Sequence, residues 1–228
     1  MNKTVIITGA GRGIGYELCK IYSEAGWNTI GISRNINSLS SLEGVQAISS
    51  DLRSEKAFAD LSTSLLQIPV SDYLVVIHNA GVLINKPFID TSDLDIAELF
   101  EVNYLAPLKL TRALLPLMEK YKKVHNLFLG SMGGFQGSSK YPGLSVYSSM
   151  KAAISGLSEC LAEEFKQTEI KFNTLALGAV DTEMLEEAFP GFVSGVSAGQ
   201  MSAWIFKFSE SAFGLINGKV IPVAGANP

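Results

Sequence analysis

The sequence has few of the residues that build disulfide or metal frameworks. It contains two cysteines and two histidines in 228 residues. Cys19 and Cys160 both fall in segments with the spacing of amphipathic helices, and their positions indicate neither a disulfide framework nor a metal site. We therefore expect two reduced thiols in or near the core, the usual place of free cysteine, and no metal centre.

Long apolar runs and concentrated charge are also missing. Charge or glycine interrupts each apolar run well before the ~20 residues that a membrane span requires. The N-terminus leads straight into a sequence typical of a strand, with no cleavage site after it. Lysine and arginine are scattered and the formal net charge is −4, whereas nucleic-acid binding needs a concentrated basic face. We expect a cytoplasmic protein that binds neither a membrane nor nucleic acid.

The sequence does contain ample material for a core. Hydrophobic residues make up 47% of the chain and charged residues 18%, which is typical of a globular protein. No internal repeat, low-complexity tract or linker divides the chain. We therefore expect one domain over residues 1–228.

Short apolar runs rich in valine and isoleucine alternate with amphipathic segments of helix length. The expected strands are residues 3–9, 28–33, 45–49, 73–81, 124–131, 171–177 and 218–223. The expected helices are residues 14–25, 54–66, 93–103 with continuation past Pro107 to 121, 147–166 and 201–210. Continuous apolar strands are typical of parallel sheets covered on both faces, and the β-α-β order implies right-handed crossovers. The pattern predicts an α/β fold with a doubly wound parallel sheet of Rossmann type.

A glycine-rich stretch, TGAGRGIG at residues 8–15, joins the first strand to the first helix. It does not fit G-x-G-x-x-G, because its spacing is T-G-x-x-x-G-x-G. Glycines let the backbone approach a pyrophosphate closely, and the helix behind them offers free N–H groups to the anion. This context favours dinucleotide binding over a purely structural turn. The predicted cofactor contacts here are Gly9, Gly11, Arg12, Gly13, Ile14 and Gly15.

The end of the second strand indicates which dinucleotide binds. An acidic residue there would hold the ribose hydroxyls of NAD, whereas an arginine suits the extra phosphate of NADP. The chain has Ser33 and Arg34 and no carboxylate, and Arg12 lies in the glycine-rich turn. Guanidinium groups bind phosphate bidentately. NADP(H) is therefore favoured over NAD(H), with two solvated surface arginines as the alternative.

Tyr147 and Lys151 stand one helical turn apart, so their side chains are neighbours. A cation favours phenolate. At ~4 Å and an effective dielectric of ~20 the interaction reaches about 4 kcal/mol, enough to lower the phenol pKa from about 10 toward 7. That value suits general acid-base catalysis. An isolated Y-x-x-x-K is usually an ordinary surface pair, but Ser131 upstream and the glycine-rich turn favour a catalytic one.

These elements together resemble the short-chain dehydrogenase/reductase family over nearly the whole chain. The matching pieces are TGAGRGIG, Asp51 in SSDLR, the NAG of residues 79–81, Asn103 in EVNYLAP, Ser131 in LGSMGG, and Tyr147-x-x-x-Lys151. The resemblance implies that Tyr147 exchanges a proton with the substrate oxygen and that Ser131 holds that oxygen. It also implies that Lys151 binds the nicotinamide ribose and lowers the tyrosine pKa, and that Asn103 supports a water-linked proton path.

The same resemblance implies further cofactor contacts. Asp51 and Leu52 would lie beside the adenine. Asn79 would stabilise the central strands, while Ala80 and Gly81 let the backbone approach the cofactor. Val180 and Thr182 match positions that contact the nicotinamide carboxamide.

Three features depart from the family pattern. His78 replaces the usual asparagine, either as a core residue or as one that tunes the cofactor site; His125 we take as structural. Leu177-Gly178 replaces the usual Pro-Gly in the turn after the sixth predicted strand. The loop between Ser131 and Tyr147 is about three residues longer than is common, so it either reshapes the substrate pocket or lies outside it.

The substrate pocket should be formed by that loop and by the segment after Thr182. The candidate lining residues are Met132, Phe135, Tyr141, Met184, Phe189 and Phe192. They favour an apolar or aromatic carbonyl compound, although such residues are as often core as pocket. Residues 182–200 carry three glycines and are a candidate lid.

The helices at residues 93–103 and 147–166 carry more small and apolar residues than a sheet covers. The resemblance implies a homodimer or homotetramer through these helices, although an apolar stripe also fits a face packed on the sheet.

We therefore expect an NADP(H)-dependent oxidoreductase that acts on a carbonyl compound or secondary alcohol. The alternative from another class is a non-catalytic dinucleotide-sensing protein, which would not need the Ser131, Tyr147 and Lys151 set. A lyase or epimerase with bound cofactor is a third, and Arg34 and the short chain count against it.

Overall fold

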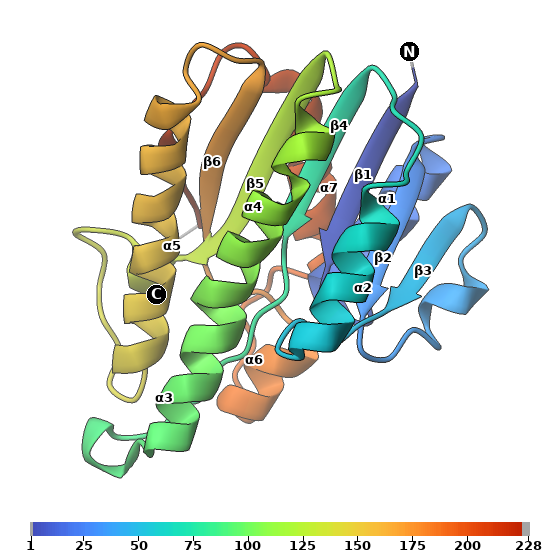
Figure 1. Ribbon diagram of the computed structural model, residues 1–228. Coiled ribbons are helices and arrows are strands. Elements are labelled where there is room, and N and C mark those ends of the chain that lie inside the picture. The colour runs from blue at the N-terminus through green and yellow to red at the C-terminus, as the bar shows by residue number, and fades with distance from the viewer. Residues whose placement is uncertain (1, 225–228) are drawn as a thin grey trace.

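The computed structural model describes residues 2–224; Met1 and residues 225–228 of the predicted domain lie outside the described residues. Within them, seven parallel strands form one sheet in the order β3-β2-β1-β4-β5-β6-β7 (Figure 1). The strands are β1 Lys3–Thr8, β2 Asn28–Ser33, β3 Val45–Ser49, β4 Tyr73–His78, β5 Lys123–Ser131, β6 Ile170–Leu177 and β7 Lys219–Val223. The chain runs outward from β1 to β3 and then returns to the other side of β1. This confirms the predicted doubly wound Rossmann-type sheet and places its switch point between β1 and β4.

Helices cover both faces of the sheet. They are α1 Gly13–Glu24, α2 Glu55–Leu65, α3 Asp93–Phe100, α4 Ala106–Met118, α5 Ser145–Glu164, α6 Glu183–Ala188 and α7 Ala198–Ser211. One face packs against α2, α4 and α5 and the other against α1 and α7, while α6 lies beyond the carboxyl ends of the strands (Figure 1). None of the helices in residues 2–224 combines the length and the apolar character needed to cross a membrane.

Burial on both faces explains why the strands read as continuous apolar runs. In β1, Ile6 packs into the core on the α2 side, whereas Val5 and Ile7 pack into the core on the α1 side. Neither face of β1 meets water, so no polar alternation is needed there.

Both histidines are buried packing residues. The His78 ring stacks on Phe128 with centroids 4.5 Å apart, and its Nε2 lies 3.2 Å from the Thr111 hydroxyl. Burial lowers the pKa of His78 to about 3 and that of His125 to about 4. His78 does not line the cavity described below, so the core interpretation of this departure fits the structure.

The predicted long helix from residue 93 is interrupted by one π-helical turn. α3 leads into Glu101–Leu105, a π-helical segment, which leads directly into α4. Pro107 has no N–H for the carbonyl four residues earlier, that of Asn103, so the regular α-helical bonding cannot pass through this turn. π-turns occur frequently at functional sites, and Asn103, only 2% exposed, lies in this one.

One expectation about local structure was wrong, and one short helix was not foreseen. Cys160 is exposed on the outer side of α5, while Cys19 is buried as predicted. Helical spacing predicts an amphipathic helix, but it did not show whether Cys160 lies on the buried or the exposed face. Helix α6 was not predicted, because six residues are too few for a periodic pattern; its start is marked by Thr182, whose hydroxyl accepts from the Leu185 N–H.

Candidate functional site

A cavity of about 1060 Å³ opens at the carboxyl ends of the strands. Its walls come from the glycine-rich turn, the ends of β2, β4, β5 and β6, the start of α5, and α6. Every predicted catalytic or cofactor-binding residue lines this cavity except Gly15. The cavity therefore lies where open α/β sheets bind their ligands, at the switch point of the strand order.

Two glycines of the glycine-rich turn pack too tightly to be replaced by residues with side chains. Gly9 has φ +66°, and a Cβ there would lie 2.7 Å from Ala80 Cα. Gly15 lies behind the turn instead of lining the cavity, since a Cβ on it would lie 2.3 Å from the Gly9 carbonyl oxygen. Asn79 fixes the turn, as its side-chain nitrogen donates to the carbonyls of Thr8 and Gly9 at 2.9 and 3.0 Å.

The start of α1 fits an anionic group. No side chain caps this helix from Arg12, and its first turn holds no acidic residue. The first N–H groups of a helix have no partner within it, and together with the dipole they favour a negative charge. With the glycines of the turn in front of it, this helix end fits the pyrophosphate of a dinucleotide.

The two arginines predicted to choose the cofactor stand near one corner of the cavity. A Cβ on Gly11 would lie 2.6 Å from Ser33 Oγ, so the glycine-rich turn touches the end of β2 beside Arg34. Both guanidinium groups belong to exposed residues that line the cavity. Arg12 is already paired, because its two terminal nitrogens lie 2.5 and 3.2 Å from the carboxylate oxygens of Glu187 in α6.

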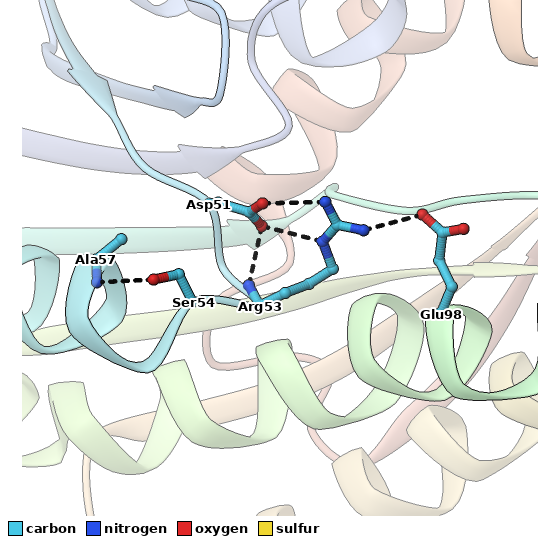
Figure 2. A network of polar contacts seen from close by, with 5 residues as sticks. All are labelled: Asp51, Arg53, Ser54, Ala57 and Glu98. Atoms are coloured by element: carbon cyan, nitrogen blue, oxygen red, sulfur yellow. Dashed lines mark hydrogen bonds and ion pairs between the residues drawn. The ribbon is translucent and has the colours of Figure 1, made fainter. Parts of the chain in front are cut away.

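The predicted adenine side is ordered by a network that the sequence did not predict (Figure 2). Arg53 donates to both carboxylate oxygens of Asp51, at 3.2 and 3.0 Å, and to Glu98 of α3 at 3.2 Å. The Arg53 guanidinium lowers the pKa of Asp51. The D-x-R spacing is visible in the sequence, but Glu98 is far away along the chain and only the fold brings it here.

The four predicted catalytic residues come together on one wall. Ser131 is the last residue of β5, and Tyr147 and Lys151 occupy the first two turns of α5. Tyr147 is 9% and Lys151 6% exposed. The Lys151 ammonium donates to the Leu129 carbonyl at 2.8 Å and lies 5.8 Å from the centroid of the Tyr147 ring.

Burial shifts the pKa values of Tyr147 and Lys151 away from what the sequence predicted. The pKa of Tyr147 is raised by desolvation, opposite to the sequence-based expectation, although the Ser131 hydroxyl opposes the rise. Burial also lowers the pKa of Lys151 to about 8. The prediction considered only the attraction between two groups at ~4 Å, whereas the ammonium lies over the ring and burial desolvates both groups. At neutral pH the phenol is therefore protonated and most of the lysine is charged.

Asn103 fixes the chain beside Lys151. Its side chain accepts from the Val82 N–H at 3.2 Å and donates to the Val82 carbonyl at 2.9 Å. A Cβ on Gly81 would lie 3.1 Å from the Asn103 oxygen and 3.6 Å from Lys151 Nζ. Asn103 thus holds the backbone of Val82, which lines the cavity near Lys151. The water-linked proton path stays a prediction.

The rest of the cavity is largely apolar. Met132, Tyr141, Met184, Phe189 and Phe192 line it as predicted, but Phe135 does not. Phe135 follows a short 3₁₀ turn and its carbonyl accepts from Lys140 at 2.6 Å, so it belongs to the loop's own structure. The long loop still reaches the cavity through Tyr141 and Leu144, which favours the alternative in which it shapes the pocket.

The turn after β6 keeps its place despite the missing proline. The Gly178 N–H donates to the Val223 carbonyl at 3.0 Å, and Leu177, Gly178 and Val180 all line the cavity.

Comparison with known proteins agrees with this architecture. A family model described as short chain dehydrogenase matches residues 3–191. The chain is 31% identical to dehydrogenase/reductase SDR family member 7B of Bos taurus over 198 residues, 80% of this chain and 59% of that protein. The chain thus spans less than two thirds of that relative's length.

Solved structures share the fold. 4-Hydroxyisoleucine dehydrogenase complexed with NADH has a TM-score of 0.86 at 24% identity, covering 99% of this chain and 98% of that one, and it supports the fold alone. A short chain dehydrogenase of Shigella flexneri 2a str. 301 complexed with NADP has a TM-score of 0.85 at 25% identity, covering 97% of each chain. Together with the match over residues 3–191, these findings confirm the predicted resemblance: the chain belongs to the short chain dehydrogenase family, a family of NAD(P)-dependent oxidoreductases.

Proposed function

We propose that this protein is an NADP(H)-dependent oxidoreductase that interconverts a carbonyl compound and the corresponding secondary or primary alcohol. One observation carries the proposal. Ser131, Tyr147 and Lys151, from two separate elements, line the same cavity as the glycine-rich turn at the open end of α1. A sensing protein would need the turn but not the proton donor.

The bound cofactor supplies the hydride, and the protein supplies orientation and the proton. The Ser131 hydroxyl donates to the substrate oxygen and holds it next to the Tyr147 hydroxyl. Tyr147 gives its proton to that oxygen in reduction and takes it back in oxidation. The raised pKa of Tyr147 keeps the phenol protonated at neutral pH, which is the form that reduction requires.

Lys151 and Asn103 support this proton transfer. The Lys151 ammonium, held by the Leu129 carbonyl, stabilises negative charge on the phenol oxygen once the proton has left and donates to the ribose hydroxyls. Asn103 keeps the Val82 backbone in place beside it.

The test is a reduction assay with the whole protein. NADPH and a panel of ketones and aldehydes, apolar and aromatic compounds first, are mixed with the protein while nicotinamide absorbance is followed. We expect consumption of NADPH that depends on both protein and carbonyl compound. Tight NADPH binding with no turnover across the panel would favour the sensing alternative.

The preference for NADP(H) is supported by the corner formed by Ser33, Arg34 and Arg12. Replacing Arg34 with aspartate removes a cation there and adds an anion. We expect the ratio of NADPH to NADH affinity to fall by about tenfold or more, since hydrogen bonds to charged groups contribute about 1.5–3 kcal/mol. Titration of nicotinamide fluorescence with each cofactor measures this ratio. An unchanged ratio would remove Arg34 from phosphate recognition.

The apolar lining supports an apolar or aromatic carbonyl compound as substrate. Residues 182–200 support a lid: Asp181 accepts from the Ser194 and Gly195 N–H groups at 2.7 and 3.1 Å, which ties both ends of the segment together. α6 and the half-exposed Phe192 project between these ends.

A homodimer or homotetramer is the proposed assembly. Leu94 on α3 is 83% exposed, and Ala152 and Ala153 on α5 are exposed as well. These residues lie on the helices that the sequence indicated for pairing. The cytoplasmic location stays a prediction of the sequence.

A further inference from the structure

An ion pair joins the glycine-rich turn to the proposed lid. Arg12, just before α1, uses both terminal guanidinium nitrogens to contact both carboxylate oxygens of Glu187 in α6. Both residues line the cavity. The pair therefore connects a proposed phosphate-binding residue to the proposed lid.

The pair is weak enough to exchange partners. The Arg12 side chain is 52% exposed and that of Glu187 61%, and exposed ion pairs contribute little to stability. Yet the contact is bidentate, the geometry in which a guanidinium also binds phosphate. A phosphate and Glu187 would therefore use the same donors of Arg12.

The pairing of the other arginines at this end of the cavity shows why the partner of Arg12 is important. Arg53 is occupied by Asp51 and Glu98. Within residues 2–224, Arg34 forms no ion pair. A second carboxylate, that of Glu183, also faces the turn, since a Cβ on Gly13 would lie 3.5 Å from it. While Glu187 holds Arg12, Arg34 is the remaining uncommitted cation of the three.

We propose that Glu187 is a specificity-determining residue for the cofactor: it holds Arg12 and yields it to a ligand that carries an additional phosphate. Binding of that phosphate also breaks the contact that ties α6 to the turn, so cofactor binding loosens the lid for substrate entry. The inference deepens the proposed function and, as regards the cofactor, rests on it.

The first experiment compares cofactor affinities by nicotinamide fluorescence. Glu187→Gln should tighten NADPH binding about fivefold and change NADH binding less than twofold. Glu186→Gln is the matched control, because it removes the same charge from the same helix and its carboxylate accepts from the Gly191 N–H instead of contacting Arg12. The Glu186→Gln control should keep the ratio of NADPH to NADH affinity within twofold of the wild-type ratio. In an Arg12→Gln background, Glu187→Gln should have no effect on the ratio.

Equal tightening of both cofactors by Glu187→Gln, or no change, would overturn the specificity role. So would a change of the ratio that persists in the Arg12→Gln background.

A second readout needs no nucleotide. Amide hydrogen exchange of residues 183–188 should be faster in Glu187→Gln than in the wild type. The Arg12→Gln variant and the double variant should exchange at the same rate as each other, because the ion pair is absent from both. If neither NADPH nor NADH binds, the proposed function and the specificity role both fail, while the exchange rates still decide whether the ion pair holds α6. Unchanged exchange in Glu187→Gln would overturn the link to the lid.

Discussion

Replacing Tyr147 with phenylalanine is expected to reduce turnover by about 10²–10⁴-fold, the usual contribution of a positioned general acid-base group. The substitution removes one hydroxyl and keeps the ring that packs at the start of α5. NADPH affinity should therefore stay within a few fold of the wild type, and the loss should appear in kcat. Steady-state kinetics and a fluorescence titration measure the two quantities.

Tyr141→Phe is the matched control, because Tyr141 lines the same cavity on the longer loop. We expect its kcat within a few fold of the wild type. Turnover that persists in Tyr147→Phe would move the proton donor to another group, and equal losses in both variants would indicate a packing effect.

Replacing Lys151 with methionine is expected to lower turnover by about 10²-fold or more without destabilising the fold at pH 7. The variant loses the ammonium that would stabilise the phenolate, so catalysis suffers. It also loses a buried charge: burial lowers the pKa of Lys151 to about 8, against about 10.4 for a free lysine, which corresponds to about 3 kcal/mol. Loss of the hydrogen bond to Leu129 offsets about 1 kcal/mol of that gain.

The free energy of unfolding should depend on pH differently in the wild type and in Lys151→Met. Between about pH 8 and pH 10.4 the unfolded chain holds a proton on Lys151 that the folded chain has released, so Lys151 contributes a rise in wild-type stability through this window, whereas buried Cys19, whose pKa is raised to about 12, contributes a fall. Below pH 8 the full cost of burying the charge is present. Lys151→Met should lack the rise, and Lys56→Met, at an exposed position of α2, should keep it. Urea unfolding at pH 7 and pH 10 measures the difference. A methionine variant that keeps the rise would show that Lys151 is not a buried cation.

The order of elements was predictable because each strand and helix carries its own local pattern. β2 and β3 match their predicted bounds, since valine- and isoleucine-rich runs end at polar residues there. The residues that line the cavity were predictable for a different reason. The strands are parallel, so residues at their carboxyl ends and in the following turns gather at one edge of the sheet. Gly15 does not line it because it lies behind the glycine-rich turn, and Phe135 belongs to the structure of its own loop.

Contacts between distant segments were not predictable in the same way. Glu98 and Glu187 look like ordinary surface acids in the sequence, yet one holds Arg53 and the other Arg12. The π-helical turn at Asn103 joins α3 to α4. The periodicity of the sequence predicted one continuous helix there.

The sequence by itself indicated the family, the parallel sheet and most of the side chains at the cavity, because periodicity predicts the strands and helices and the motifs resemble those of the family. Only the tertiary structure decided the state of those side chains. Packing buried Tyr147 and Lys151 together and so favoured the neutral phenol, and the fold of residues 182–200 brought a carboxylate to Arg12. Burial and charge pairing depend on which distant segments meet, and that is fixed when the chain folds.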